Sequence, residues 1–482
     1  MKLGEYASYD GLGLADLVAR GEVSPRELAQ TALAAIEAAD DKINAVVETY
    51  DDRISGPDES SLGSGPFRGV PFLIKDVGGH EKGRKIEFGS RLCEGMIGEV
   101  DTNYYKLARA AGLNVLGRTN TPEYSIAGSA ENLLYGNTST PWREGYSAGG
   151  SSGGAGAAVA AGMVPLAHGS DIAGSIRIPA AWCGGVGLKP SRGLISAGPV
   201  ADEGGFGLAM NFVQSKTMRD TAAMLDCLSL PQPGDPFIIK RPDAPYASFL
   251  RPPDAPLRIA YSAAPLMDAP VDPEIAEATK RVALLLETMG HHVEEVPLPF
   301  DGDEASRAMV NFWFFGFDRQ LDSFARKTGR QIGPDTLEPV VLEIYKMAQR
   351  LEPHRFLESW GWINAARRRL GQFFAEYDVF VSPSMAVPAP PHGPYGLNHP
   401  GMDPVSYLIH GDKPVQYSFP FNVSGGPALS LPLAQHSTDL PIGIQLAAGP
   451  SNDHLLIGLG ALLEEALPWL GRVPPLHVSN RV

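Results

Sequence analysis

Cysteine is scarce in this 482-residue sequence, which contains only Cys93, Cys183 and Cys227. An odd, widely spaced set favours a reducing compartment and argues against both a disulfide framework and a multi-cysteine metal site. The adjacent His291 and His292 have no ligand spacing either, because neighbouring residues of a strand point to opposite faces. We therefore expect no metal and no cofactor.

Basic residues and long apolar runs are also in short supply. Lysine and arginine number 40 against 55 aspartates and glutamates, and the net charge is −15. A general nucleic-acid-binding protein needs basic surface to neutralise phosphates, so the charge argues against that class. No segment approaches the ~18 uninterrupted apolar residues of a spanning helix, and the N-terminal sequence MKLGEYASYDGLGL lacks the pattern of a signal peptide. We expect a soluble, cytoplasmic protein without nucleic-acid or membrane partners.

Short apolar strands alternate with helices along the chain. Ser24 to Glu27 form a capping box with proline at the first helical position, and the residues that follow have amphipathic helical spacing. A second clear helix begins at Asp272 and stops at Gly290. The other expected elements are strands over 69–77, 113–117, 164–167, 291–296 and 420–445, and helices over 102–111, 152–161 and 305–375. The alternation predicts an α/β fold with a mainly parallel or mixed sheet.

The stretch from Gly149 to Arg177, GGSSGGAGAAVAAGMVPLAHGSDIAGSIR, is rich in glycine and serine. A phosphate cradle is a poor interpretation, because neither GxxxxGK[ST] nor GxGxxG after a strand is present. Residues 149–153 match the nucleophile elbow G-x-S-x-G, but the preceding TSTPWREGY does not resemble the strand that this motif requires. A scaffold of catalytic serines and backbone amides is the third interpretation.

Lys75 interrupts the apolar run GVPFLIKDV at residues 69–77. A buried ammonium group is costly unless it is paired or loses its proton. The alternative, a lysine at a strand end that reaches water, fits this segment equally well.

Three motifs together resemble the amidase signature family: GVPFLIKD from residue 69, GGSSGG from 149 and GSDIAGSIRIPAAWCGGVGLKP from 169. The resemblance continues through TNTPE at 119–123, YGNTSTPW at 135–142, FPFNVSGGPALSLP at 419–432 and PIGIQL at 441–446. It implies one large domain over residues 1–482, with a central mixed, twisted sheet covered by helices on both faces. It also implies a catalytic core at about 60–225 plus 415–475, and a helical substrate-pocket region at about 305–375.

The resemblance implies a Ser-cisSer-Lys triad, in which Lys75 is the base, Ser151 the bridging serine and Ser175 the nucleophile, with a cis peptide between Gly150 and Ser151. The residue types fit this chemistry, because a serine hydroxyl is a weak nucleophile until a base removes its proton. No histidine lies in these motifs, so a lysine made neutral by burial is the available base. Ser151 both donates and accepts hydrogen bonds, and so can relay a proton.

Backbone N–H groups are expected to hold the oxyanion, and neighbouring polar side chains to support the loop. The implied oxyanion donors are Ile172, Ala173, Gly174 and Ser175, and the implied supporting residues are Ser152, Asp171 and Arg177. Many members of the family have glycine where this chain has Ala173, but the N–H is the same. The expected reaction is acylation of Ser175 by an amide, release of the amine and hydrolysis of the acyl-enzyme.

The likeness within the family is nearest to the 6-aminohexanoate-cyclic-dimer hydrolase branch. The pocket cysteine of that hydrolase has no counterpart in the aromatic run at 312–317, which argues against cyclic-dimer activity. Tyr124, Ile126, Trp313 and Phe317 are candidate pocket walls, although packing in the core explains each of them equally well. An aromatic pocket favours hydrophobic, aryl or xenobiotic amides, anilides, carbamates or linear amide oligomers.

A rival interpretation from another class is the amidotransferase A subunit, a glutaminase that works on misacylated tRNA inside a larger complex. It shares the triad, so the triad does not exclude it. The aromatic helical region is poorly suited to a glutamine pocket and favours the stand-alone amidase. By analogy with relatives, we expect a homodimer acting on a small-molecule amide.

Overall fold

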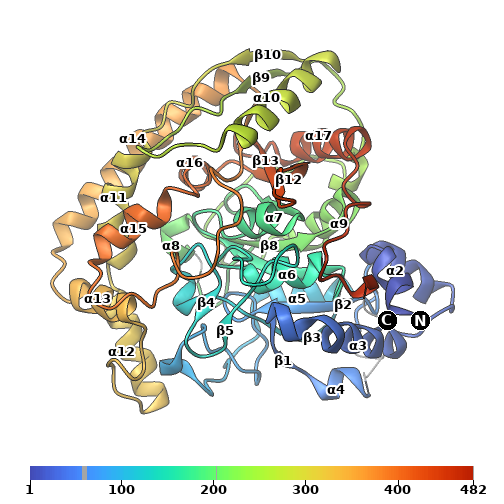
Figure 1. Ribbon diagram of the computed structural model, residues 1–482, viewed down its shortest axis with the longest axis horizontal. Helices are drawn as coiled ribbons and strands as arrows, with labels where there is room; N and C mark the ends of the chain where they lie inside the picture. The colour runs from blue at the N-terminus through green and yellow to red at the C-terminus, as the bar shows by residue number, and fades with distance from the viewer. Residues whose placement is uncertain (57–61, 202, 481–482) are drawn as a thin grey trace.

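The computed structural model describes residues 1–56, 62–201 and 203–480. Within these residues eleven strands form one mixed sheet in the order β1-β3-β2-β6-β8-β7-β12-β13-β11-β9-β10, and β4 pairs with β5 in a small ribbon. Helices flank the sheet on both faces (Figure 1). The strands are β1 (Val46–Thr49), β2 (Pro71–Lys75), β3 (Asn114–Thr119), β4 (Glu131–Asn132), β5 (Gly136–Asn137), β6 (Leu166–Asp171), β7 (Val186–Lys189), β8 (Met210–Ser215), β9 (Arg258–Tyr261), β10 (His292–Glu295), β11 (Val379–Pro383), β12 (Ala428–Gln435) and β13 (Pro441–Ala448).

The helices cover the sheet and build a separate helical region beside it, at α11 to α15 (Figure 1). None of the described helices is long and apolar enough to cross a membrane. The helices are α1 (Leu3–Ser8), α2 (Gly11–Ala19), α3 (Pro25–Ile43), α4 (Asp51–Ile54), α5 (Asn103–Ala110), α6 (Gly153–Ala160), α7 (Arg177–Cys183), α8 (Gly204–Gly207), α9 (Met218–Leu228), α10 (Pro273–Thr288), α11 (Gly302–Phe314), α12 (Phe317–Thr328), α13 (Pro339–Ala348), α14 (Pro353–Glu376), α15 (Pro404–Asp412), α16 (Phe419–Ser424) and α17 (Asp453–Ala466).

The predicted elements are confirmed with one exception. The capping box at Ser24 is formed with both of its hydrogen bonds, and α3 follows it. The predicted helical region becomes four helices, α11 to α14, and prolines begin two of them. The prediction of a strand from Pro420 was wrong, because residues 419–424 form α16 and β12 begins only at Ala428. Proline fits the first turn of a helix, and Gly425 in the left-handed conformation ends α16.

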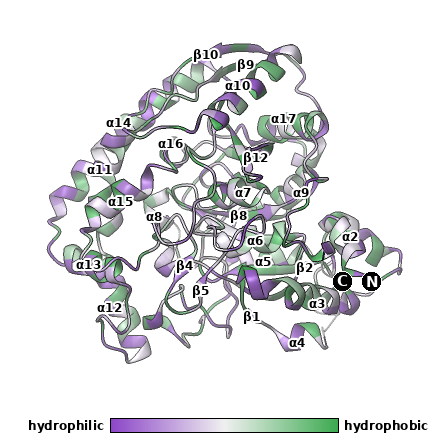
Figure 2. Ribbon diagram, in the orientation of Figure 1, coloured by the Kyte–Doolittle hydropathy of each residue, from purple (hydrophilic) through white to green (hydrophobic). Residues whose placement is uncertain are grey.

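Close packing of small residues places the glycine- and serine-rich segment around α6 against the sheet. Residues Gly153 to Val159 of α6 are all buried. A Cβ at Gly154 would lie 2.4 Å from the backbone nitrogen of Asn120, so only glycine permits this approach. Hydrophobic residues are frequent in the central strands and in α6 and α7, whereas the outer helices α11 to α13 alternate in hydropathy (Figure 2). The run of glycine and alanine therefore serves to bring α6, and the serines before it, close to the strands.

Candidate active site

Lys75 is the last residue of β2 and is only 1% exposed. Its Nζ lies 2.6 Å from Ser151 Oγ and 2.9 Å from Ser170 Oγ. The parallel pairing of β2 with β6 brings Ser170 to the same end of the sheet. The lysine at the strand end therefore does not reach water, and it meets the predicted bridging serine. Ser170 was missed by the sequence analysis, because nothing in the motif that begins at Gly169 shows that its hydroxyl contacts Lys75.

Burial sets the protonation of this lysine. Burial lowers the pKa of Lys75 to about 7, although the negative charge of Asp171 opposes the shift. A lysine with this pKa is half neutral near pH 7 and can accept a proton. His168 lies beside it, but burial and then the charge of Lys75 lower the pKa of His168 to about 3. Its Nδ1 accepts the backbone N–H of Lys75 at 3.3 Å, so His168 supports the lysine and is not free to act as the base.

The two glycine-rich segments are tied together at the serines. The Gly150–Ser151 peptide is cis, and Ser151 is 1% exposed. The N–H of Ser152 donates to the carbonyl of Ser175 at 3.2 Å, and the N–H of Ser170 donates to Ser152 Oγ at the same distance. Ser175 is 7% exposed, which makes it the most accessible of the three predicted catalytic residues. Ser152 thus links the two segments, and its supporting role stays a prediction.

The loop after β6 is organised by the Asp171 carboxylate, which accepts N–H groups from Gly174 at 2.8 Å and Ile176 at 3.2 Å. The Gly174 N–H is therefore already engaged, and the expectation that it holds the oxyanion is corrected. Burial would raise the pKa of Asp171, but the charge and hydrogen bonds of Arg177 outweigh burial and hold this pKa well below its usual range. Asp171 stays ionised and keeps the loop folded.

Arg177 is fully buried and forms an ion pair with Asp171 at 2.8 Å. Its Nη1 donates to the Ser418 carbonyl at 2.7 Å and to Gln445 Oε1 at 2.8 Å, and its Nη2 donates to Asn422 Oδ1 at 2.7 Å. Ser418 immediately precedes α16, Asn422 lies in α16 and Gln445 lies in β13. They lie inside the motifs at 419–432 and 441–446, or next to them, but those motifs gave no sign of which residues contact Arg177.

Two of the predicted pocket residues contact each other, and a third lies at the edge of the same apolar cluster. Tyr124 meets Phe317 edge to face with ring centroids 5.6 Å apart, and Trp313 packs on the cluster that includes Phe317. Ile126 is partly buried and packs against the same cluster. The loop that carries Tyr124 and Ile126 continues to Ser129, whose backbone nitrogen lies against Gly150. The structure thus places these residues beside the segment of the bridging serine.

Phe206 is an aromatic residue that the sequence analysis missed. It is 38% exposed, and its ring centroid lies 4.8 Å from those of both Phe312 and Phe356. Its φ is +54°, a left-handed value that bulky residues rarely adopt. The preceding Gly205 lies directly against the side chain of Ile172 in the catalytic loop. Phe206 therefore joins the aromatic helical region to the predicted oxyanion loop.

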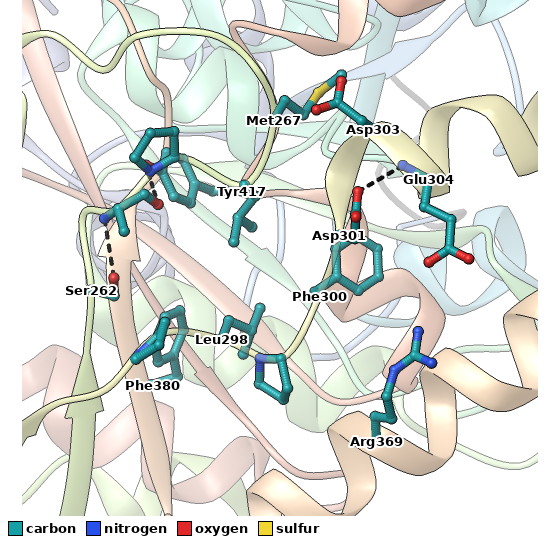
Figure 3. A pocket seen from close by; sticks show the side chains of 15 residues that line it. Ser262, Met267, Leu298, Phe300, Asp301, Asp303, Glu304, Arg369, Phe380 and Tyr417 are labelled. Atoms are coloured by element: carbon teal, nitrogen blue, oxygen red, sulfur yellow. Dashed lines mark hydrogen bonds between the residues drawn. The ribbon is translucent and has the colours of Figure 1, made fainter.

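A separate cavity of about 590 Å³ lies beyond the carboxyl ends of β9 and β10. Figure 3 shows apolar side chains such as Leu298 and Phe380 in its wall, with acidic residues from the start of α11 nearby. None of its described lining residues belongs to the predicted triad, and it approaches the candidate site through Tyr417, which precedes Ser418. The described residues also contain no cluster of three or more histidine, cysteine, aspartate or glutamate side chains that could hold a metal ion.

Comparison with known proteins identifies the family. The family model named Amidase matches residues 27–457. The chain is 35% identical to a 6-aminohexanoate-cyclic-dimer hydrolase of Paenarthrobacter ureafaciens, over 98% of this chain and 97% of that protein. It is 32% identical to an acylamidase of Rhodococcus erythropolis, over 96% of both chains. A solved structure of 6-aminohexanoate cyclic dimer hydrolase complexed with substrate superposes with a TM-score of 0.92 and 33% identity, covering 98% of this chain and 99% of that one. The chain belongs to the amidase signature family and is a hydrolase of amide C–N bonds.

Proposed function

We propose that the protein cleaves carboxylic amides through Ser175 as nucleophile, Ser151 as relay and Lys75 as base. The observation that carries the proposal is the buried Lys75 Nζ at 2.6 Å from Ser151 Oγ. A neutral amine so close to a hydroxyl can take its proton, and that hydroxyl can in turn take the proton of a second serine. Ser175, the least buried of the three, is then the group that attacks the amide carbonyl.

The reaction proceeds through an acyl-enzyme. Attack by Ser175 forms a tetrahedral intermediate, whose oxyanion is held by the N–H groups of Ile172, Ala173 and Ser175, while the Gly174 N–H holds the loop on Asp171. Protonated Lys75 returns its proton through Ser151 to the leaving nitrogen, and the amine departs. Water then attacks the ester carbonyl, with the same relay as general base, and releases the carboxylic acid.

The substrate class follows from the apolar surroundings of the catalytic loop. We assign the helical region α11 to α14 as the substrate-pocket region, with Tyr124, Ile126, Trp313 and Phe317 in its wall and Phe206 added from the structure. Aromatic walls favour hydrophobic substrates, because a polar or charged group would lose its hydration there. The proposed substrates are hydrophobic, aryl or xenobiotic amides, anilides, carbamates or linear amide oligomers.

A substrate panel tests the proposal. Purified protein is assayed on p-nitroanilides of aryl and alkyl acids, a primary aryl amide, a carbamate, linear 6-aminohexanoate oligomers and glutamine. Ser175→Ala is expected to abolish turnover, whereas Ser248→Ala, at an exposed serine remote from the triad, is expected to retain it. Turnover that survives Ser175→Ala would overturn the assignment of the nucleophile. Glutamine turnover that depends on a copurifying partner would instead support the amidotransferase subunit.

The proposal also includes the compartment and the oligomeric state of the protein. The three cysteines are free thiols, with Cys93 and Cys183 buried, which supports a reducing, cytoplasmic compartment. A homodimer is proposed by analogy, and light scattering coupled to gel filtration measures it. A mass close to one chain at micromolar concentration would refute the dimer.

A further inference from the structure

A second cavity, of about 570 Å³, lies where the two ends of the chain meet, away from the catalytic serines. Figure 1 shows both termini beside α2. Val159 and Ala160, at the end of α6, and Cys183, at the end of α7, line the cavity. Both helices begin next to the predicted catalytic serines and end at this cavity, so it lies ~10 Å from the triad along their axes.

The charged residues in the wall of this cavity are mainly cationic. Lys216, Arg219 and Arg472 line it, against a single carboxylate, Asp10. Asp10 forms an ion pair with Arg219 at 2.5 Å. In the described part of the chain, Lys216 and Arg472 form no salt bridge with any carboxylate. The cavity therefore has an excess of positive charge in a protein whose net charge is −15.

The two cations without a carboxylate partner keep donors for a ligand. Lys216 Nζ donates to the Ala7 carbonyl at 3.2 Å, and Arg472 donates to the Pro432 carbonyl. An ammonium has three N–H donors and a guanidinium five, so a single carbonyl uses only part of each group. Both side chains are half-buried, where a charge interacts with an anion more strongly than it does in water.

Two further carboxylates lie near Lys216 and Arg219 but are engaged elsewhere. Asp220 accepts the N–H groups of Gly11 and Leu12, and Glu464 accepts the N–H of Met218. Burial raises the pKa of both acids, which reduces their negative charge near neutral pH. Burial lowers the pKa of Lys216 to about 8, while the charges of Asp220 and Asp10 oppose that shift, so the lysine stays mainly protonated near pH 7. Among the described residues, neither Asp220 nor Glu464 forms a salt bridge with a cation of the wall.

Two tryptophans give the cavity an apolar side. The indole N–H of Trp142 donates to the Cys183 carbonyl and that of Trp469 to the Lys216 carbonyl, each at 2.8 Å. Because both N–H groups are used within the protein, the rings offer a ligand only carbon surface. A cavity with fixed cations on one side and indole rings on another suits an amphipathic anion.

We propose that this cavity binds an organic carboxylate with an apolar body, whose carboxylate meets Lys216 and Arg472 and whose body lies against Trp142 and Trp469. Arginine and lysine both bind carboxylates, and the guanidinium does so with two parallel N–H donors. Inorganic phosphate would satisfy the cations but leave the apolar side empty. The proposal does not depend on the chemistry at Ser175.

Calorimetric titration of the full chain with 4-phenylbutanoate tests it, in the Ser175→Ala background so that turnover does not interfere. One acid per chain is expected, with at least tenfold weaker binding of inorganic phosphate and of the neutral 4-phenylbutanol. Lys216→Gln is expected to weaken binding of the acid at least tenfold. Equal affinity for phosphate and the acid would overturn the role of the apolar wall.

A second variant at an exposed position keeps the proposal testable if Lys216→Gln does not fold. Val473 lines the cavity and is 45% exposed, so Val473→Glu adds a negative charge at the rim without burying it. It is expected to weaken binding at least tenfold, whereas Leu284→Glu, at a 42% exposed site on α10, is the matched control and is expected to leave binding unchanged. Undiminished affinity in Val473→Glu would place the acid elsewhere, the catalytic pocket included, and would refute the proposal.

Discussion

The protonation of Lys75 makes a quantitative prediction for the pH dependence of catalysis. With a pKa of about 7, this lysine is half neutral at pH 7, about one-tenth neutral at pH 6 and about nine-tenths neutral at pH 8. A lysine at its ordinary pKa of 10.5 would be neutral in only ~0.03% of molecules at pH 7, so burial raises the reactive fraction about 10³-fold. Since the base must be neutral, kcat/KM should fall about tenfold per pH unit below 7 and level off above 8.

The variant Ser170→Ala sharpens this prediction. Ser170 Oγ accepts a hydrogen bond from Lys75 Nζ at 2.9 Å, and such a bond favours the charged lysine. A hydrogen bond to a charged group contributes ~1.5–3 kcal/mol, and 1.36 kcal/mol corresponds to one pKa unit. Loss of the hydroxyl should therefore lower the pKa of Lys75 and move the acid limb of kcat/KM about one to two units to lower pH.

The assay is initial-rate hydrolysis of a p-nitroanilide from pH 5.5 to 9 at constant ionic strength. Ser170→Thr keeps the hydroxyl and is expected to keep the wild-type midpoint, which separates the hydrogen bond from a general disturbance of packing. A flat wild-type profile between pH 6 and 8, or a midpoint near 10, would refute the role of a neutral lysine. A shift of the Ser170→Ala limb to higher pH would refute the stated role of the serine.

The catalytic loop and its aromatic surroundings tolerate little change. Arg177→Met leaves a buried carboxylate unpaired and should lower the free energy of unfolding, measured by urea titration, by about 3–5 kcal/mol; a loss below 1 kcal/mol would contradict this. Gly174→Ala places a methyl group 2.6 Å from Ser418 Cβ, at a φ of +120° that side chains rarely adopt. The variant should keep the fold but lose on the order of tenfold or more in kcat. Ala173→Gly is the control and should have a kcat near that of the wild type. Phe206→Ala should reduce kcat/KM about three- to tenfold more for aryl than for alkyl anilides, and equal losses would exclude it from the pocket.

Local rules predicted most of the elements correctly. The helix after Ser24 has a capping box and a proline, so its start depends on residues within four positions of each other. Local rules gave the wrong element for the segment from Pro420 to Ser424, which was predicted as a strand and is a helix. An apolar run this short fits a strand and a buried helix equally well. Pro420 in the first turn and Gly425, which ends that helix, were the local signals that could have distinguished them.

The site was predictable only where residue type limits the chemistry. Lys75 in an apolar strand is unusual enough to single out, and its burial beside Ser151 agrees with the expected role. Ser170 was not predictable, because its contact with Lys75 depends on the register of two parallel strands. Phe206 was missed for a related reason, since its position depends on a left-handed turn and on helices more than a hundred residues away.

The anchoring of Arg177 has a consequence for synthesis of the chain. All three predicted reactive residues precede Arg177, yet Gln445, which holds its guanidinium, follows 268 residues later. The strand β12, which separates β7 from β13 in the sheet, is also made late. At ~5–20 residues per second, a ribosome needs roughly 15–50 s to make this intervening stretch. During that time the nascent polypeptide already contains Lys75, Ser151 and Ser175 but lacks Gln445, so the contacts that anchor Arg177 are complete only when translation is almost finished.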